Sequence, residues 1–213
     1  MEQSDEQQTD ERREAEPIDR RQQIIEAALR VFSTKGFHKA TNKDIAEAAG
    51  GISPGLIYWY FKDKEDLFVS IVRERAAIFQ LADHPEQLME LPPAEGLALI
   101  GRTYLSIFRV PGNVALVRIV VGEAIRFPQM AEMFVKLVGQ RFLGLISQYL
   151  QHQVDLGRLR PHNTMIAGRS FIGMFVVNVV ARELLRMPDT LTIPDEQIVE
   201  TVVGIFLTGL GAE

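Results

Sequence analysis

Apolar residues recur along the chain mostly three or four positions apart, which is the spacing of one face of an α-helix. Between residues 20 and 35 this face consists of Ile25, Ala28, Leu29 and Phe32. Gly36 follows directly and is a typical stop signal for a helix. We therefore predict an amphipathic helix over Arg20–Lys35. The chain shows little of the alternation of apolar and polar residues that strands require.

Two short helices are predicted around a glycine turn. Thr41 can cap the first of them, and Asp44, three residues later, can reach back as in a capping box. This helix ends at Gly50-Gly51. Ser53-Pro54 is typical of an N-cap followed by proline in the first turn, and it starts a helix that runs to about Tyr60. A further helix is predicted after Asp63.

The second part of the chain is more apolar, and its predicted helices are longer. They cover Pro93–Phe108, Gly112–Ile125, Pro128–Asp155, Asn163–Arg186 and Pro194–Leu210. Prolines and glycines separate them. The pattern predicts an all-α fold with two domains. The first is an N-terminal three-helix helix-turn-helix domain at 20–77, with its motif at 41–60. The second is a helical domain at 78–213.

Composition restricts the possible functions. The chain has 213 residues, of which 46% are hydrophobic and 24% charged, and it contains no cysteine. This excludes disulfides and cysteine nucleophiles, and it fits the reducing cytoplasm. The longest uncharged apolar run near the end, Phe171 to Ala181, is well short of the roughly 20 residues that span a bilayer. We therefore expect no membrane partner.

The formal net charge of −5 counts against a nucleic-acid partner until it is divided along the chain. Residues 1–19 hold eight acidic and two basic side chains, a composition that predicts a disordered acidic leader. Residues 20–76 hold ten Lys or Arg against seven Asp or Glu, a net charge of +3. Residues 77–213 hold eleven against thirteen. The predicted helix-turn-helix is therefore the basic part of an acidic chain.

The segment 41–60 has the spacing of a DNA-binding helix-turn-helix, whose second helix enters the major groove. Ser53, Pro54 and Gly55 keep the N-terminal end of that helix small, so its backbone can approach phosphates. The lysines that flank the unit and can neutralise phosphates are Lys39, Lys43, Lys62 and Lys64. A plain αα-hairpin with a glycine turn would show the same spacing. The run Tyr58-Trp59-Tyr60-Phe61 favours DNA binding, because consecutive aromatic residues cannot all face one core.

Residues 20–77 resemble the DNA-binding domain of the TetR family of transcriptional regulators. The residues that carry the resemblance are Ile24-Ile25-Glu26-Ala27-Ala28, Phe32, Lys35-Gly36-Phe37, Thr41, Asp44-Ile45-Ala46, Ala49-Gly50, Ser53, Gly55, Tyr58, Tyr60-Phe61 and Lys64-Glu65-Asp66-Leu67. The resemblance implies a recognition helix that starts at Ser53. It implies phosphate contacts from Thr41, Tyr58 and Lys64, and base contacts from the region of Lys43 and of Ser53 to Leu56.

The complete set of candidate DNA-binding residues is Thr41, Lys43, Ser53, Pro54, Gly55, Leu56, Tyr58, Trp59 and Lys64. The chain departs from the family pattern at Gly50-Gly51, where one extra residue lengthens the turn. Pro54 also lacks a backbone donor, so we expect few base contacts and more dependence on DNA shape and phosphates.

The helices of the second domain carry more apolar surface than one protomer can cover, which indicates self-association. The expected homodimer interface consists of Ile172, Val176, Val179, Val202, Ile205, Phe206 and Gly209. The resemblance agrees, because regulators of this family usually dimerise through their last two helices. Two recognition helices would then meet a roughly palindromic site on double-stranded DNA.

The resemblance also implies a small-molecule pocket in the second domain. The residues proposed to line it are Tyr104, Phe108, Arg118, Glu123, Phe127, Met130, Phe134, Phe175 and Asn178. Aromatic and Met side chains with a few polar groups are typical of such cavities. Each of these residues can equally belong to the core. Asn178 can bond a neighbouring backbone group, and Glu123 can pair with Arg118 or Arg126.

Catalytic chemistry has little support in the sequence. None of the four histidines has the spacing of a metal ligand with another candidate ligand, and no cofactor motif is found. We therefore expect no enzyme activity, no metal and no cofactor, the rival being an all-α enzyme that uses Glu123. The preferred function is a repressor that releases its operator when a small apolar effector binds. The alternative is a regulator that binds DNA or a protein without a small-molecule effector.

Overall fold

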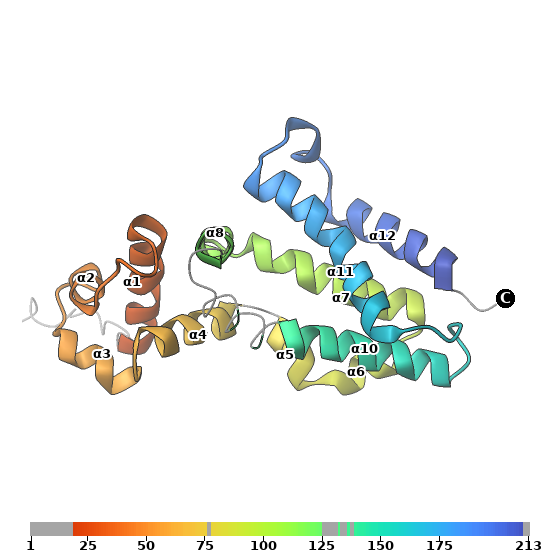
Figure 1. Ribbon diagram of the computed structural model, residues 1–213, viewed down its shortest axis with the longest axis horizontal. Coiled ribbons are helices and arrows are strands. Elements are labelled where there is room, and N and C mark those ends of the chain that lie inside the picture. The colour runs from red at the N-terminus through yellow and green to blue at the C-terminus, as the bar shows by residue number, and fades with distance from the viewer. Residues whose placement is uncertain (1–18, 76–77, 125–131, 133–135, 137–138, 211–213) are drawn as a thin grey trace, which may run out of the picture.

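The computed structural model describes residues 19–75, 78–124, 132, 136 and 139–210 of the chain. These residues are mostly helical, with no strand among them, which confirms the predicted all-α class. The molecule is elongated, with the first helices at one end and the last helices at the other (Figure 1).

The N-terminal end contains four helices. They are α1 (Arg20–Lys35), α2 (Asn42–Ala48), α3 (Pro54–Tyr60) and α4 (Lys64–Arg75). Asp19, the last residue of the predicted leader, accepts bonds from two backbone N–H groups of α1 and is its N-cap. Residues 1–18 lie outside the described part of the chain.

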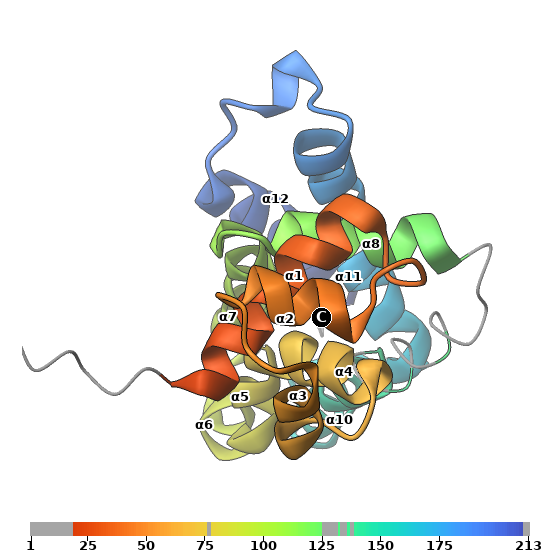
Figure 2. The same ribbon diagram turned by 90° about the vertical axis from the view of Figure 1, so that its left-hand side faces the viewer.

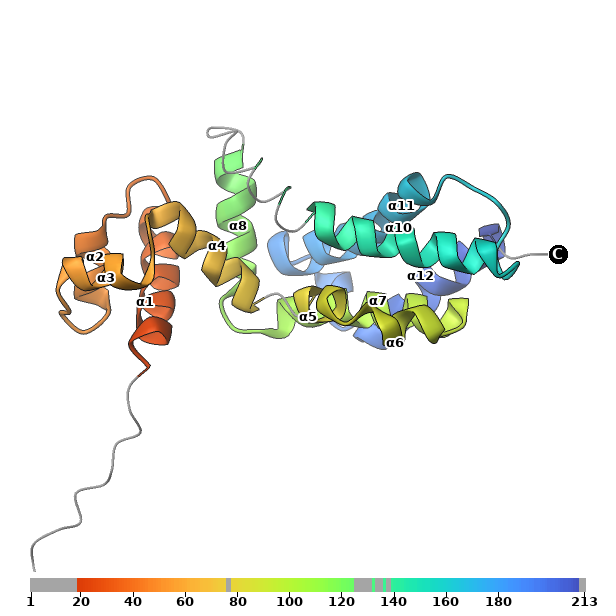
Figure 3. The same cartoon turned by 90° about the horizontal axis from the view of Figure 1, so that it is seen from below.

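The remaining helices form the larger part of the molecule. They are α5 (Ile78–Asp83), α6 (Pro85–Glu90), α7 (Pro93–Ser106), the 3-10 turn η1 (Ile107–Arg109), α8 (Asn113–Ala124), α10 (Gln140–Asp155), α11 (Thr164–Val179), the π-helical turn η3 (Val180–Leu184), the 3-10 turn η4 (Pro188–Thr190) and α12 (Asp195–Leu210). Helix α8 lies between the N-terminal helices and the rest (Figure 3). The early part of the predicted Pro128–Asp155 helix falls mostly outside the described residues.

The predicted helix Asn163–Arg186 is wrong at its end, because α11 gives way to the π-helical turn η3. The Leu185 amide donates to the Val180 carbonyl five residues earlier, at 2.9 Å. A π turn inserts one residue into the helical repeat, and an apolar pattern does not reveal it. Arg186 then takes a φ of 53° and ends the helix.

The core of the N-terminal end forms around α1. Phe32 of α1 packs against Phe37 and Phe68, with ring centroids 5.1 and 6.2 Å apart. All three side chains are at most 2% exposed. Because Phe68 belongs to α4 and Phe37 to the loop before α2, this cluster joins three segments and fixes where α2 begins.

In the C-terminal part, Tyr149 of α10 is fully buried against the first turn of α7. Its hydroxyl donates to the carbonyls of Leu91 and Pro92, at 3.1 and 3.0 Å. A Cβ atom at Gly96 would overlap the Tyr149 ring and hydroxyl. Gly96 therefore permits the close approach of α7 and α10.

The stretch Thr164–Leu184 has the length and apolar composition of a helix that could cross a membrane, with a mean hydropathy of 1.6 over its most apolar window. Only 22% of that window is buried inside the protomer. The core helix of a soluble protein passes the same test, so the feature is weak evidence for a membrane span. It does identify an apolar surface on α11 that the protomer itself leaves uncovered.

We expect Gly96→Ala to lower the free energy of unfolding by about 1–3 kcal/mol, because the new methyl group overlaps a buried side chain that cannot move without loss of its hydrogen bonds. Urea denaturation followed by circular dichroism measures the change. Gly144→Ala is the matched control, since a Cβ at Gly144 of α10 meets nothing within 4 Å. It should be neutral or raise stability by up to about 1 kcal/mol. Equal effects of the two substitutions would contradict the close-approach argument.

Candidate DNA-binding surface and apolar cavity

The start of α2 is held by a capping box. The Asp44 amide donates to Thr41 Oγ1 at 3.2 Å, and the Thr41 amide donates to Asp44 Oδ2 at 3.0 Å. Lys35 of α1 also bonds Asp44, at 2.6 Å. The hydrogen bonds from Lys35 and Thr41 lower the pKa of Asp44 to about 2. The exposed N-terminus of α2 is therefore fixed to the end of α1, and Thr41 is used in the cap.

The turn between α2 and α3 is built from two left-handed glycines. Gly50 and Gly51 have φ values of 83° and 76°, which favour glycine over other residues. The amide of Ile52 donates to the Ala46 carbonyl at 3.1 Å and closes the turn. Gln23 of α1 holds the turn from outside with a 2.7 Å bond to the Ala49 carbonyl. The extra residue of the turn thus has a defined conformation.

Helix α3 lies at the N-terminal end of the molecule, which faces the viewer in Figure 2. Most of its side chains are exposed to solvent. Ser53 caps it by accepting a bond from the Gly55 amide at 3.3 Å, and Ile57, at 1% exposure, anchors it to the core. By contrast, Tyr58 and Trp59 are 61% and 87% exposed. Two exposed aromatic side chains of this size, with the Tyr58 hydroxyl as a donor, form a suitable surface for a phosphate backbone.

The two lysines proposed to contact DNA differ in their surroundings. Lys43 is exposed on α2. The Lys64 ammonium group instead donates to three carbonyls of the loop before α2, those of Phe37, His38 and Ala40, at 2.8 to 3.1 Å. Burial lowers the pKa of Lys64. This geometry makes Lys64 a clamp on the loop that precedes Thr41.

An apolar cavity of about 360 Å³ lies among α4, α7, η1, α8, α10, α11 and η3. Its lining consists of Val72, Arg75, Tyr104, Ile107, Phe108, Asn113, Leu116, Val117, Val121, Gly139, Phe142, Leu143, Ile172, Val176, Val179, Val180 and Leu184. Only three of these residues have a polar side chain, namely Arg75, Tyr104 and Asn113. The volume and the apolar character suit a small molecule.

Of the residues proposed from the sequence to line a pocket, Tyr104 and Phe108 lie in this lining. The Tyr104 ring stacks on Phe142, and burial raises the pKa of Tyr104 to about 12. Phe175 and Asn178 are not in the lining. Phe175 packs instead over Gly101, and Asn178 donates to the Met174 carbonyl at 2.8 Å. Phe127, Met130, Phe134 and the side chain of Glu123 fall outside the described residues.

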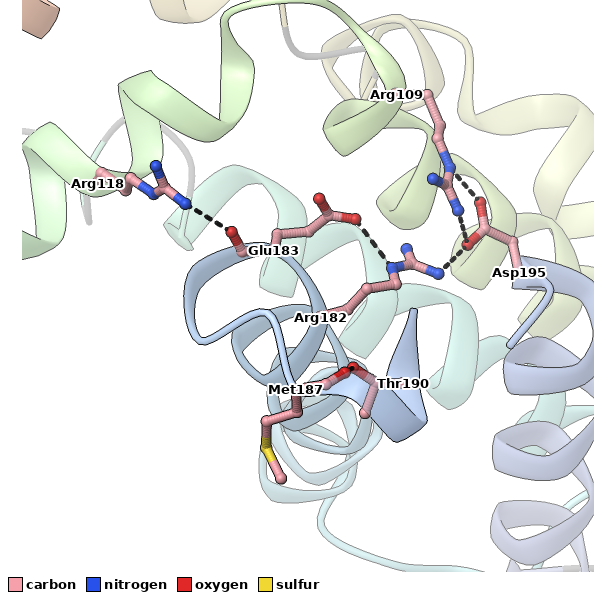
Figure 4. Close-up of polar contacts among 7 residues, drawn as sticks. All are labelled: Arg109, Arg118, Arg182, Glu183, Met187, Thr190 and Asp195. Atoms are coloured by element: carbon pink, nitrogen blue, oxygen red, sulfur yellow. Dashed lines mark hydrogen bonds and ion pairs between the residues drawn. The ribbon is translucent and has the colours of Figure 1, made fainter. Parts of the chain in front are cut away.

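Arg118 lines a different hollow, an open one of about 460 Å³ between α1 and α8. Its Nη2 donates to the Glu183 carbonyl at 2.8 Å and so ties α8 to the π turn (Figure 4). The same turn carries Arg182, which is 4% exposed and bonds Glu183 and Asp195 at 2.9 and 2.7 Å. This network holds η3, which contributes Val180 and Leu184 to the apolar cavity.

A second arginine strengthens this network from η1. Arg109 donates to both carboxylate oxygens of Asp195, through Nε at 2.8 Å and Nη2 at 2.6 Å (Figure 4). Burial alone would raise the pKa of Asp195, but Arg109 and Arg182 together hold it below its usual value. Asp195 is the first residue of α12, so the ion pairs join the start of the last helix to η1 and η3.

Sequence reasoning missed the lining residues from α4 and from the start of α8. Val72 and Arg75 end α4, and Asn113 begins α8. The Asn113 side-chain amide donates to the carbonyls of Arg75 and Ile107, at 3.0 and 2.7 Å. An arginine at a helix end and an asparagine after a turn are ordinary sequence features, so no local signal identifies them.

The residues proposed for the dimer interface divide into two groups. The side chains of Ile172, Val179, Val202 and Phe206 are each at most 9% exposed and pack inside the protomer. Val176 and Ile205 are 39% and 62% exposed, and Gly209 is also exposed. An unpredicted neighbour, Val177, is 69% exposed. The uncovered apolar surface of α11 and α12 therefore includes Ile166, Val177 and Ile205, whereas Val176 also lines the apolar cavity.

Comparison with known proteins identifies both parts of the chain. Residues 24–71 match the family described as bacterial regulatory proteins of the tetR family. Residues 95–211, more than half of the chain, match the C-terminal domain of AefR-like transcriptional repressors.

Individual relatives agree with these matches. The HTH-type transcriptional regulator UidR of Escherichia coli K12 is 29% identical over 81% of this chain and 87% of its own length. The fatty acid metabolism regulator protein of Bacillus subtilis 168 is 36% identical, and the match covers 45% of this chain and 48% of that protein.

The fold matches a solved regulator as well. The crystal structure of the transcriptional regulator FadR from Bacillus subtilis in complex with stearoyl-CoA aligns over 88% of this chain and 98% of FadR. The TM-score is 0.67 and the sequence identity 20%. The match to the tetR family thus covers the helices around α3, and the AefR-like match covers most of the helical C-terminal part. The chain belongs to the TetR family of bacterial transcriptional regulators, and its C-terminal domain is of the AefR-like type.

Proposed function

We propose that this regulator is a homodimeric repressor that releases its operator when a small apolar molecule occupies the cavity among α4, α8 and α11. The observation that carries the proposal is the position of α4. Leu67 and Phe68 of this helix pack in the core beneath the helix-turn-helix, whereas Val72 and Arg75 line the cavity. One short rigid element therefore touches both sites, and a ligand that shifts its end changes the placement of α3.

The position of α4 also supports the proposed division of the chain into two domains. Residues 20–77 form the DNA-binding domain, with its helix-turn-helix at 41–60, and residues 78–213 form the effector-binding and dimerisation domain. Residues 1–19 are a leader before the first domain. Because the partner is DNA, we place the protein in the cytoplasm.

For DNA recognition we propose a division of labour. Lys43 and the exposed N-terminal turn of α3, from Ser53 to Leu56, face the major groove. Tyr58 and Trp59 contact the backbone beside it. Lys64 acts by positioning the loop that carries Thr41, since its ammonium group is already bonded to three carbonyls of that loop.

The effector is proposed to be largely apolar, because most of the cavity wall is aliphatic or aromatic. The structure of FadR with stearoyl-CoA supports an apolar chain as one ligand class compatible with the fold. Switching requires that the effector bind the DNA-releasing arrangement more tightly than the DNA-bound one. The alternative function, a regulator that binds DNA or a protein without a small-molecule effector, would leave the cavity without a role.

Chromatin immunoprecipitation with sequencing, done with and without candidate metabolites and beside transcript levels, tests the function as a whole. Sites that are lost on addition of an effector, with a rise of the neighbouring transcript, would support ligand-released repression. Occupancy that no metabolite changes would contradict the effector role and favour a constitutive regulator. The recovered sites also supply the operator for the measurements below.

We expect Lys43→Ala to make the plot of log K for operator binding against log salt concentration shallower by about 0.9, because one fewer counterion is released. Fluorescence anisotropy over a range of salt concentrations measures this slope. Lys136→Ala is the matched control, since Lys136 is an exposed lysine outside the N-terminal helices. An unchanged slope for Lys43→Ala would remove Lys43 from the interface.

Tyr58→Phe should weaken operator binding by about 1.5–3 kcal/mol and leave the salt slope unchanged, since it removes one hydrogen bond to a charged phosphate but no positive charge from the protein. The same anisotropy titration measures both quantities. Tyr60→Phe provides the comparison with a less exposed tyrosine on the same helix. If Tyr58→Phe binds as tightly as the wild type, its hydroxyl makes no phosphate contact.

The dimer proposal predicts that Ile205→Glu converts the protein to a monomer, because the new carboxylate would be buried between two copies of an apolar surface. Sedimentation equilibrium measures the mass, and operator affinity should fall with it. Leu156→Glu is the matched control, since Leu156 is 50% exposed and is the C-cap of α10, outside the two helices α11 and α12. A dimer that survives Ile205→Glu would place the interface elsewhere.

Val117→Phe should fill part of the cavity and lower the affinity for an uncharged apolar probe, N-phenyl-1-naphthylamine, at least tenfold. The fluorescence of the probe on transfer to an apolar site measures binding. Gly122→Phe is the control on the same helix, because Gly122 lines the other hollow and its Cβ would meet nothing within 4 Å. Probe binding lost in Gly122→Phe and kept in Val117→Phe would assign the ligand to the hollow between α1 and α8.

A further inference from the structure

Among the three polar side chains that line the apolar cavity, Arg75 and Tyr104 each have a donor group without a hydrogen-bond partner in the described part of the chain. The Asn113 amide hydrogens are both used on backbone carbonyls, and its oxygen faces Arg75 Nη1 at 3.5 Å. The Tyr104 hydroxyl has no partner among the described residues. The Arg75 side chain is 12% exposed, and its Nε is buried without a hydrogen-bond partner in the described part of the chain.

Two of the three guanidinium nitrogens of Arg75 have hydrogen-bond partners, and Nε has none in the described part of the chain. Its Nη1 donates to the Pro111 carbonyl at 2.6 Å. Its Nη2 bonds Glu26 of α1. The edge formed by Nε and Nη2 is therefore half occupied, because Glu26 takes Nη2 alone. A buried donor without a partner costs stability, so this edge has unused capacity for an acceptor.

Two other arginines in the chain show how such an edge is filled. Arg102 donates to both oxygens of Glu196, through Nε at 3.0 Å and Nη2 at 2.5 Å. Arg109 holds Asp195 through the same two atoms. A carboxylate on this edge makes two parallel charge-assisted bonds, which are stronger than the single bond from Arg75 to Glu26.

We propose that the effector is an apolar carboxylate whose head group binds the Nε–Nη2 edge of Arg75 and displaces Glu26. The inference rests on the proposed ligand-binding role of the cavity and specifies its ligand class. An anion enters an apolar site only where a charge pairs with it, and Arg75 is the basic residue in the lining. Because Nε is covered, the guanidinium must turn from Glu26 toward the cavity to receive the ligand.

This exchange connects the ligand to the DNA-binding end. Glu26 belongs to α1, which carries the core under the helix-turn-helix, and Arg75 is the last residue of α4. Loss of their ion pair removes one of the two ion pairs that join the end of α4 to α1. A second ion pair between the same helices, Arg21 with Glu74, lies outside the cavity lining and stays intact. It provides a matched control for Glu26.

The test uses three probes with the same ten-carbon chain, namely decanoate, decanol and decylammonium, and measures their binding by isothermal titration calorimetry. Wild-type protein should bind decanoate most tightly and decylammonium least. In Arg75→Gln the ratio of decanoate affinity to decanol affinity should fall at least tenfold. A ratio is used because a general disturbance of the cavity lowers both affinities alike.

Glu26→Gln keeps Arg75 in place and tests the exchange even if Arg75→Gln folds poorly. We expect it to raise decanoate affinity and to reduce the effect of decanoate on operator binding, because the competitor of the ligand is weakened. Glu74→Gln should change neither quantity. Identical results for Glu26→Gln and Glu74→Gln would overturn the exchange.

The remaining outcomes separate this inference from the proposed function. If decanol binds and releases the operator as well as decanoate does, the ligand-released repressor stands and the carboxylate assignment fails. An affinity ratio that Arg75→Gln leaves unchanged also overturns the assignment, as does failure of decanoate to bind. If decanoate binds through Arg75 but leaves operator affinity unchanged, the head-group assignment stands and the proposed switch fails.

Discussion

The packing of α4 against α1 is the contact on which the rest of the structure depends. Leu67 and Ile71 are fully buried, and Phe68 stands in the aromatic cluster with Phe32. The helix thereby completes the core that supports α2 and α3, and its last turn reaches the cavity. Because protein interiors are close-packed, a displacement at that end has to be taken up by the whole helix or by its contacts with α1.

Helix α3, the proposed recognition helix, depends on its neighbours for stability. Helix α3 has seven residues, far fewer than an isolated helix needs in water. It is held by the buried Ile57, the Ser53 cap and the turn of Gly50 and Gly51 that precedes it. Its placement therefore follows α1 and α2, and any movement that α4 transmits to α1 reaches the DNA-binding surface.

Gly112, which directly precedes α8, permits a close contact between α8 and the N-terminal helices. It has a φ of 88°, and a Cβ there would lie 2.7 Å from Leu29 Cδ2 and 3.4 Å from Arg75 Nη1. The start of α8 therefore lies close against α1 and the end of α4. Arg75, Glu26 and Asn113 join the same region by hydrogen bonds, so the proposed effector site and the packing of α4 on α1 share these side chains.

The sequence by itself determined the local features. The limits of α1, the capping box at Thr41 and Asp44, the glycine turn and the exposed aromatic run follow from short-range rules on spacing, caps and backbone freedom. Only the tertiary structure decided which apolar residues line a cavity, as Phe108 does, and which fill the core, as Phe175 does. Periodicity shows that a side chain faces inward, but whether it meets another side chain or a space depends on helices far away in the chain. The π turn at η3 and the half-used edge of Arg75 depend on such distant contacts in the same way.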